Sequence, residues 1–352
     1  MYASGWLYSP TMSAFPEALA LCWHPVAYSH EVTDKPFATT LLEEALVIWR
    51  SADGAPHAMK DLCIHRGTAL SLGWVSGDEL VCGYHGWRYN AEGACTLIPQ
   101  KANPTVVPTK ARIQRYACME RYGLIWVLMG EAPRYALPEI PEFENGEWKI
   151  VNTGPFTWAS DASRQVENFT DFGHFPWVHP GLLGDVARPV VPEHSVEVRG
   201  HVLHYTVVRP EAPNSDDFKV FANEQTVKPE RRSRYELHLP YTIALRLGWG
   251  GVKGMVYFFA SQPMRRNQSR GYCIIGRNYD LEQPDSVLQG FEDTIFGQDQ
   301  RIVESQRPEQ VPFDLADELH LTFDAVAVNY RRAMHAQGLD YYPHLDEQDG
   351  AV

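Results

Sequence analysis

The stretch Cys63-Ile64-His65-Arg66-Gly67, read together with Cys82-Gly83-Tyr84-His85-Gly86-Trp87, contains two pairs of side chains that can bind metal. The spacing is Cys-x-His, then sixteen residues, then Cys-x-x-His. Zinc also takes two Cys and two His, but zinc fingers usually place both Cys before both His. Here each pair holds one Cys and one His. This order suits a two-iron, two-sulfide cluster in which one iron takes both Cys and the other takes both His.

The residues around these pairs favour the same interpretation. Gly67 and Gly86 permit backbone conformations that suit loops wrapped around a cluster, and backbone amides in such loops can donate hydrogen bonds to sulfur. The segments CIHRG and CGYHGWRYNAEGAC resemble the Rieske motif of the ring-hydroxylating and demethylating oxygenases, although that family usually has Pro where this chain has Gly83. The predicted ligands of the [2Fe-2S] cluster are Cys63, His65, Cys82 and His85. A zinc site, or four residues placed for packing, is the alternative.

Composition excludes several classes of protein. The chain has 352 residues and a formal net charge of −13, which argues against a nucleic acid or an anionic membrane as partner. No apolar run approaches the roughly 20 residues that span a bilayer, and the N-terminus does not resemble a signal peptide. Six Cys in a chain of this length do not indicate a disulfide framework. We therefore expect a cytoplasmic protein with free thiols.

The pattern of strands and turns predicts an α+β protein in two parts. Short strand-like runs between Trp23 and Leu128, separated by Gly- and Asp-containing turns, indicate a small all-β domain that carries the cluster loops. Three prolines between Gly130 and Pro141 indicate a connector. The later runs indicate an antiparallel sheet covered by helices. By the family resemblance, this part is a catalytic domain with a helix-grip, START-like fold. The expected divisions are a lead-in at 1–22, a Rieske domain at 23–130 and a catalytic domain at 131–352.

Within the second part, apolar periodicity predicts individual elements. Strands are expected at 150–158, 190–198, 201–208, 235–247, 255–259 and 272–276, and helices at 161–172, 285–306 and 317–337. The polar stretch 209–234 is expected to form a surface excursion near the substrate entrance. The Arg231-Arg232 pair is interpreted as a solvated face, with contact to an acidic partner or a substrate carboxylate as the alternative. Trp249, Met255 and Tyr257 are expected in the core, with the substrate pocket as the alternative.

A second metal centre is indicated by the segment Asn168-Phe169-Thr170-Asp171-Phe172-Gly173-His174-Phe175-Pro176-Trp177-Val178-His179. Asp171 and His174 are three residues apart and share a face if the chain is helical there. Gly173 and Pro176 interrupt a regular helix, so His179 can approach the same point from a separate turn. Two His and one carboxylate form the open iron site of non-haem oxygenases. A pair of His satisfied within a core is the alternative.

The carboxylate ligand must come from elsewhere in the chain. On a helix over 287–304, with about 100° per residue, the apolar side chains form one stripe and Asp299 lies near its centre. An unpaired carboxylate on a buried face is unfavourable unless a metal is present. Glu292 shares the stripe and is the reserve candidate. The segment GQDQRIVESQRP also resembles the family's segment with the carboxylate ligand. The predicted mononuclear Fe(II) site is therefore His174, His179 and Asp299.

The resemblance also implies roles for two residues beside this site. In the family, the Asp of Asp-x-x-His accepts a hydrogen bond from its own iron-ligating His and one from a cluster His of the neighbouring subunit. By this resemblance, Asp171 links His174 to His85 of the next subunit and connects the two metal centres. Asn168 matches a family position beside the iron, where it orders water or shapes access. Asp171 and Asn168 are the predicted catalytic residues.

The resemblance covers nearly the whole chain and is strongest for the vanillate O-demethylase and methylxanthine N-demethylase type. It implies the terminal oxygenase component of a monooxygenase that uses O₂ on a small aromatic or heterocyclic substrate. Electrons come from NAD(P)H through a separate flavin- or ferredoxin-type reductase, since this chain has no NAD or flavin fingerprint. Hydroxylation of an O- or N-methyl group releases formaldehyde. The family also implies a head-to-tail homotrimer.

Three other functions stay open at this point. A Rieske hydroxylase acting on a non-aromatic natural product has the same two motifs. A simple electron-transfer Rieske protein explains the first motif but leaves the second without a role. A zinc-stabilised binding module explains four ligands and predicts a colourless protein. Iron content and visible absorption separate the last two from an oxygenase.

Overall fold

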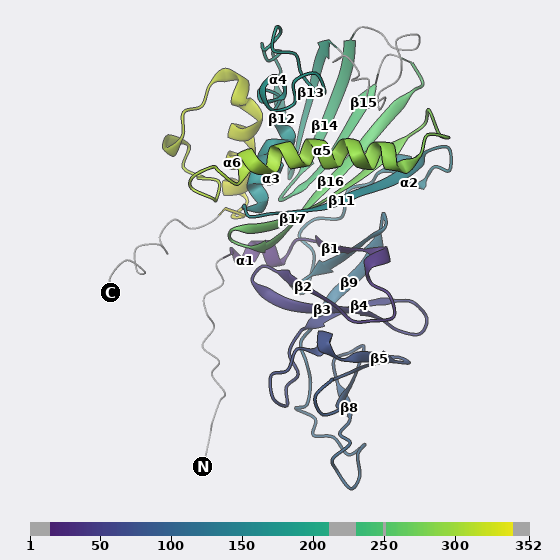
Figure 1. Ribbon diagram of the computed structural model, residues 1–352. Helices are drawn as coiled ribbons and strands as arrows, with labels where there is room; N and C mark the ends of the chain where they lie inside the picture. The colour runs from purple at the N-terminus through teal and green to yellow at the C-terminus, as the bar shows by residue number, and fades with distance from the viewer. Residues whose placement is uncertain (1–14, 211–229, 249–250, 341–352) are drawn as a thin grey trace.

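A computed structural model describes residues 15–210, 230–248 and 251–340. The N-terminal part is built from strands, in a six-stranded sheet of order β1-β10-β9-β4-β3-β2 and a four-stranded sheet of order β5-β6-β7-β8. The smaller sheet lies farthest from the rest of the molecule (Figure 1). The strands are β1 (His24–Tyr28), β2 (Phe37–Leu41), β3 (Glu44–Arg50), β4 (Pro56–Lys60), β5 (Trp74–Ser76), β6 (Glu79–Val81), β7 (Arg88–Asn90), β8 (Cys95–Leu97), β9 (Arg115–Arg121) and β10 (Leu124–Leu128).

The C-terminal part is a seven-stranded antiparallel sheet of order β11-β17-β16-β15-β14-β13-β12, with helices packed on it (Figure 1). Its strands are β11 (Lys149–Trp158), β12 (Val196–Arg199), β13 (Val202–Pro210), β14 (Glu230–His238), β15 (Thr242–Gly248), β16 (Gly254–Arg265) and β17 (Gln268–Arg277). Its longer helices are α3 (Ala162–Thr170), α5 (Asp285–Val303) and α6 (Ala325–Ala336). Single turns of helix are α1 (Glu17–Ala20), α2 (Pro141–Glu144) and α4 (Phe175–Val178).

The helix α5 crosses one face of this sheet and brings its apolar stripe onto it (Figure 1). Pro284 precedes its first turn, where its fixed φ suits the start of a helix, and Asp285 favours the positive end of the helix dipole. The buried positions recur every three or four residues, as an amphipathic helix requires. They are Leu288, Phe291, Glu292, Ile295, Phe296, Asp299 and Val303. Ile302, an apolar residue of the same helix, is 42% exposed.

The two parts of the chain share one apolar core. Buried side chains of β1, β2 and β3 belong to the same cluster as those of β14, β16 and α5. Backbone amides in the turn after β2 extend the contact, since Leu42 N donates to Pro263 O at 2.8 Å and Glu43 N donates to Met264 O at 2.9 Å. Gln262 Nε2 donates to Thr39 Oγ1 at 2.8 Å. The six-stranded sheet is therefore fixed against the seven-stranded sheet by packing and by hydrogen bonds.

The observed fold confirms the predicted α+β class, and several predicted elements change. The expected single run 235–247 forms two strands, β14 and β15, because Pro240 between them has no N–H for the ladder. The run 190–198 is strand only from Val196. The expected helix 317–337 begins at Ala325, after the short 3₁₀ turns Leu315–Asp317 and Thr322–Asp324.

The excursion expected over 209–234 is wrong at both ends. Arg209 belongs to β13, and Glu230 to Arg234 belong to β14, where they pair with β13 and β15. The remaining positions, 211–229, lie outside the described residues, as does Trp249. The predicted boundary near residue 130 falls between β10 and β11, and the limits of the two domains stay a prediction. No helix in the described parts of the chain is both long enough and apolar enough to cross a membrane.

Candidate metal centres

The two loops that hold the predicted cluster ligands have the same backbone design. In the first, Gly67 N donates to Cys63 O at 2.9 Å, and in the second, Gly86 N donates to Cys82 O at 2.9 Å. Both glycines have φ near +70°, with +72° at Gly67 and +69° at Gly86, a conformation in which a side chain is strained. Each loop therefore turns back on itself directly after its His.

These turns bring the four predicted cluster ligands to one end of the N-terminal part. The thiols of Cys63 and Cys82 are buried at 2% and 1% exposure. The rings of His65 and His85 lie 4.5 Å apart between centroids. Nδ1 of His65 is buried and has no hydrogen-bond partner among the described residues. Two buried thiols and two adjacent imidazoles, one of them with an unsatisfied ring nitrogen, fit a [2Fe-2S] cluster with mixed ligation.

Side chains behind the cluster loops hold these ligands in place. The ring of Trp87 stacks on His65, with 4.5 Å between centroids and an interplanar angle of 8°. Gln100 Nε2 donates to His85 O at 2.7 Å, and Trp87 Nε1 donates to Gln100 Oε1 at 3.2 Å. The hydroxyl of Tyr89 lies 3.1 Å from Cys63 Sγ. A hydroxyl at this distance from a ligand sulfur would tune the cluster's potential.

Gly83 departs from the family pattern, and its surroundings explain why a small residue is present. A Cβ at this position would lie 2.7 Å from Leu72 O and 3.4 Å from Gly73 Cα. Gly73 is even more confined, because a Cβ there would lie 1.8 Å from Val81 O. The backbone at Leu72 and Gly73 therefore runs directly against the second cluster loop. Glycine at positions 73 and 83 permits this close approach of the two backbone segments.

The second predicted centre begins where α3 ends. Asp171 follows the helix and folds its carboxylate back over the next turn, accepting from Gly173 N at 3.0 Å and from His174 N at 3.0 Å. Asp171 Oδ2 also lies 2.7 Å from His174 Nδ1. Burial acts to raise the pKa of Asp171, but these hydrogen bonds outweigh it and hold the pKa below the usual range. The ionised carboxylate can only accept, so His174 Nδ1 carries the proton and Nε2 presents a lone pair.

His179 is positioned in the same way from the other side. It caps the short helix α4, and its side chain is fully buried. Its Nδ1 lies 2.7 Å from Gln298 Oε1, which is an acceptor on α5. This contact places the proton on Nδ1 and leaves the lone pair of Nε2 for a ligand. Gln298 was not predicted from the sequence, although it directly precedes Asp299.

Asp299 completes the group of three. Its Oδ1 lies 2.9 Å from His179 Nε2 and 3.5 Å from His174 Nε2. One ligand atom from each of the three side chains lies within 4.8 Å of the others. Both His179 Nε2 and Asp299 Oδ1 are buried without a hydrogen-bond partner. Three acceptors that face each other in a buried space repel unless a cation lies among them, so this donor set fits a mononuclear iron.

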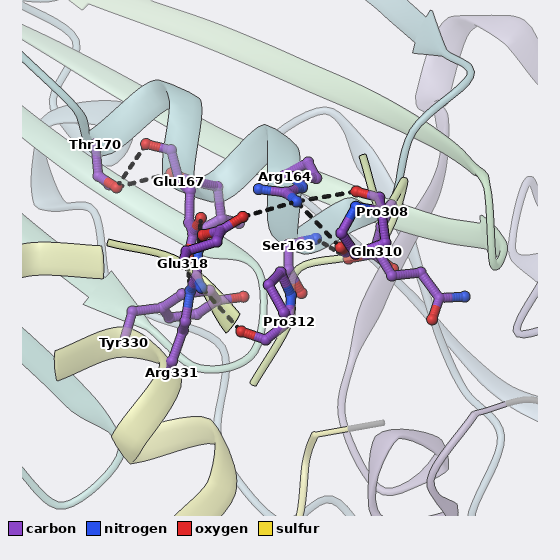
Figure 2. Close-up of polar contacts among 12 residues, drawn as sticks. Ser163, Arg164, Glu167, Thr170, Pro308, Gln310, Pro312, Glu318, Tyr330 and Arg331 are labelled. Carbon is purple, nitrogen blue, oxygen red and sulfur yellow. Dashed lines mark hydrogen bonds and ion pairs between the residues drawn. The ribbon is translucent and has the colours of Figure 1, made fainter. Parts of the chain in front are cut away.

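A buried ion network holds α3 against α6 and the segment before it (Figure 2). Arg331 Nε and Nη2 donate to the two carboxylate oxygens of Glu167 at 2.6 and 2.8 Å. Arg331 Nη2 also donates to Glu318 Oε2 at 2.6 Å, and Arg164 Nη2 donates to Glu318 Oε1 at 3.2 Å. Glu167 is four residues before Asp171. The network therefore fixes the helix turn from which Asp171 and His174 extend.

Two hollows meet at this centre. A surface groove is lined by Asp171 and His174 together with residues of α6 and the segment before it. A second cavity, on the inner side, is lined by His174, His179 and Asp299 and by residues of β13, β14, β15, β16 and α5. Asn168 and His174 line both hollows. Tyr257 lines the inner cavity, as its alternative interpretation proposed, whereas Met255 is a buried core residue.

The inner cavity also contains the charged residues Arg231 and Glu292. Arg231 was interpreted as part of a solvated face, but its side chain is 2% exposed and lines the cavity. Arg232, its neighbour on the strand, is exposed as expected. Glu292, the reserve ligand, is 3% exposed and accepts from Tyr257 Oη at 3.2 Å. It is not one of the three converging residues.

Comparison with known proteins identifies the family to which this architecture belongs. Residues 22–117 match the model of the Rieske [2Fe-2S] domain. Residues 158–338 match the model of the vanillate O-demethylase oxygenase C-terminal domain. The chain belongs to the Rieske non-haem iron oxygenases. It is therefore an oxidoreductase that uses O₂, with a [2Fe-2S] cluster and a mononuclear iron as its cofactors. The Rieske match argues against the zinc module, and the C-terminal match argues against the simple electron carrier.

Relatives of this oxygenase include two types of demethylase. It is 33% identical over 329 residues to methylxanthine N1-demethylase NdmA of Pseudomonas putida, covering 90% of this chain and 88% of the relative. It is 33% identical over 165 residues to the vanillate O-demethylase oxygenase subunit of a Pseudomonas species, covering 46% and 45%. The solved structure of P. putida NdmA with caffeine aligns with a TM-score of 0.77 at 30% identity, covering 93% of this chain and 97% of that one. These findings confirm the predicted family and fold.

Proposed function

We propose that this oxygenase hydroxylates or demethylates a small aromatic or heterocyclic substrate in the inner cavity, with electrons from a separate NAD(P)H-dependent reductase. The observation that carries the proposal is the convergence of His174, His179 and Asp299 at the edge of that cavity. The family supports a reaction with O₂. Its relatives include a methylxanthine N1-demethylase and a vanillate O-demethylase, which supports methyl groups on nitrogen or oxygen as the target.

In this proposal each metal group has a defined set of ligands. Cys63, His65, Cys82 and His85 hold the [2Fe-2S] cluster, and His174, His179 and Asp299 hold Fe(II). When bound, the iron supplies the position at which O₂ is activated beside the substrate.

The residues around the iron keep its ligands in one protonation state. Asp171 holds the proton of His174 on Nδ1, and Gln298 holds the proton of His179 on Nδ1, so both Nε2 atoms stay available. Asn168 lies on α3 between the surface groove and the cavity and is suited to order a water molecule there. The apolar walls, including Phe169 and Phe296, exclude bulk water from the substrate.

A head-to-tail homotrimer is the proposed assembly. Apolar side chains are exposed around the cluster loops, with Leu72 at 76%, Tyr84 at 64% and Trp74 at 52%. A second set is exposed near the groove at Asp171, with Leu319 at 86% and Phe323 at 44%. Surfaces of this kind favour contact between copies of the chain. Two different patches that meet produce a closed ring when the rotation between copies allows it.

The remaining parts of the proposal follow from the family and the sequence. The reductase is a flavin- or ferredoxin-type protein, and the oxygenase works in the cytoplasm. The Rieske domain spans 23–130 and the catalytic domain spans 131–352, after a lead-in at 1–22. Contact between the cluster of one subunit and Asp171 of the next is the proposed connection between the metal centres.

A coupled assay tests this function. Purified protein is reconstituted with iron and sulfide, combined with a Rieske-oxygenase reductase and NADH, and offered methoxyaromatics, N-methyl heterocycles and aromatic acids. We expect three irons per chain, together with oxygen uptake and formaldehyde release that depend on one group of substrates. A His179→Ala variant with an unchanged cluster spectrum should give neither. Two irons per chain with no substrate-dependent oxygen uptake would refute the proposal.

A further inference from the structure

The inner cavity contains a pair of arginines that the proposed reaction does not use. Arg209 on β13 and Arg231 on β14 are directly paired across the two antiparallel strands, and both line the cavity. Side chains at directly paired positions lie on the same face, about 5 Å apart at Cβ, and two like charges there are destabilising. Both arginines have contacts within the protein, and an acidic ligand in the cavity would reduce the repulsion between them further.

We propose that the substrate of this oxygenase carries a carboxylate or sulfonate group, which Arg231 binds inside the cavity beside the three predicted iron ligands. This inference rests on the proposed function and adds the chemical class of the substrate. Arg231 is the anchor, and Arg209 contributes a second positive charge to the same wall.

The position of Arg231 on its strand supports the assignment. Along β14, exposed and buried side chains alternate, and Arg231 is on the buried side with Ser233 and Tyr235. Its side chain is 2% exposed. The planar fork of donors on its guanidinium matches an acidic group with two oxygens. Arg231 has other contacts within the protein, and its five N–H donors allow it to bind a ligand as well.

Arg209 is oriented by an aromatic side chain. Its guanidinium carbon lies 4.5 Å from the centre of the Phe175 ring. Stacking on a ring uses the flat face of the guanidinium. The N–H donors on its edge can still form hydrogen bonds. Phe175 is also the residue next to His174, so this contact places Arg209 near the predicted iron ligands.

Two carboxyl groups line the same cavity, those of Asp299 and Glu292. Burial, together with the nearby charge of Asp299, raises the pKa of Glu292 to about 8, although the hydrogen bond from Tyr257 acts against this rise. In the iron-free protein Glu292 is therefore mainly protonated at pH 7. The two guanidinium groups that line the cavity favour an anion over a neutral or cationic substrate.

Matched pairs of ligands test the inference by binding alone. The iron- and cluster-loaded protein is titrated anaerobically by calorimetry with 4-methoxybenzoate and 4-methoxybenzamide, and with 4-toluenesulfonate and 4-toluenesulfonamide. Each acid and its amide share the same ring and substituent. We expect at least one acid to bind about tenfold or more tightly than its amide, since hydrogen bonds to a charged group are among the stronger ones. The two pairs show whether the acidic group is a carboxylate or a sulfonate.

Three variants test whether Arg231 is responsible for the preference for the acid over the amide. Arg231→Gln should remove the preference for the acid, and Arg231→Lys should retain part of it. Arg232→Gln is the control, because this exposed arginine lies one position along the same strand on the opposite face. Each variant is compared by thermal denaturation and by its cluster spectrum, so that loss of folding is separated from loss of binding. The lysine variant and the wild-type preference keep the test valid if Arg231→Gln does not fold.

The inference is overturned if the wild type binds none of the four probes, binds acids and amides equally, or keeps its preference in Arg231→Gln. Its failure is distinct from failure of the proposed function. If reductase-dependent formaldehyde is formed from neutral N-methyl or methoxy compounds only, the oxygenase function stands and the acidic substrate is wrong. If acids bind through Arg231 but no substrate gives oxygen uptake, the proposed reaction fails and the anion site remains.

Discussion

Replacing Asp171 with Asn gives the sharpest test of how the iron ligands are held. The change removes one negative charge and keeps the shape of the side chain. In the wild type, this carboxylate accepts three hydrogen bonds, from Gly173 N, His174 N and His174 Nδ1. An amide offers one oxygen and one NH₂ group. Whichever way the amide is oriented, an N–H group faces another N–H group, and the proton on His174 Nδ1 is no longer fixed by a charge.

The size of the effect follows from these contacts. A lost hydrogen bond to a charged group changes stability by about 1.5–3 kcal/mol. Outer hydrogen-bond partners of metal-ligating His typically change metal affinity by about 10- to 100-fold when they are removed. The side chain of Asp171 is 42% exposed, so water replaces part of what is lost. We therefore expect the Kd for Fe(II) to rise about tenfold, at the lower end of this range.

Anaerobic equilibrium dialysis against a competing chelator measures this Kd. The visible spectrum of the cluster should be unchanged, since Asp171 does not belong to the cluster loops of its own chain, and turnover with an added reductase should stop. Asp185→Asn is the matched control, because Asp185 is 37% exposed, lies in the same segment and pairs with Arg188. If Asp171→Asn binds Fe(II) as tightly as the wild type and retains turnover, the orienting role of this carboxylate is refuted.

Four further changes have expected outcomes. Gln298→Leu removes the acceptor of the His179 Nδ1 proton, and dialysis should show Fe(II) bound about 10- to 100-fold more weakly. Tyr89→Phe removes the hydroxyl beside Cys63 Sγ. Because that hydroxyl stabilises the more negative reduced cluster, spectroelectrochemistry should show a potential lower by about 20–60 mV, the one-electron equivalent of roughly 0.5–1.5 kcal/mol. Gly83→Ala places a Cβ 2.7 Å from Leu72 O, and urea denaturation should show a loss of about 1–3 kcal/mol. Glu292 has a folded-state pKa near 8 against the ordinary 4.5. Stability present below pH 4.5 is therefore lost as the pH rises through 8, and in the iron-free protein Glu292→Gln should escape this loss, on the order of 5 kcal/mol.

The features that the sequence predicted well are those whose residues are close in the chain or on one helix. The two cluster loops each span a few residues, so the spacing of Cys and His in the sequence was enough to predict that these side chains lie together. Asp299 was recognisable because a carboxylate at the centre of an apolar stripe conflicts with burial unless it has a partner. The structure brings Asp299 to within 2.9 Å of His179 Nε2. The assignment of these residues as ligands stays a prediction until metal is measured.

The features that the sequence did not predict depend on pairing between distant segments. Gln298 on α5 resembles any solvated glutamine until α4 places His179 beside it. Arg231 could be placed only once the register of β14 was known, because a shift by one residue would exchange its environment with that of Arg232. Pro240 was visible in the sequence, and the division of 235–247 into two strands could have been found from it.

His174 lies between the two sides of the catalytic part. It lines the surface groove together with Asp171, and it lines the inner cavity together with Arg231 and Glu292. The exposed fraction of the side chain falls from the groove towards the cavity, from 42% at Asp171 to 15% at His174 and 6% at Asp299. Within the described residues, the groove at Asp171 gives a partner protein access to the centre, and the proposed substrate site lies on the inner side. A change at Asp171 should affect iron binding and electron supply without altering the choice of substrate, and a change at Arg231 should do the reverse. If either variant altered both properties, the separation of the two sides by this one imidazole would be wrong.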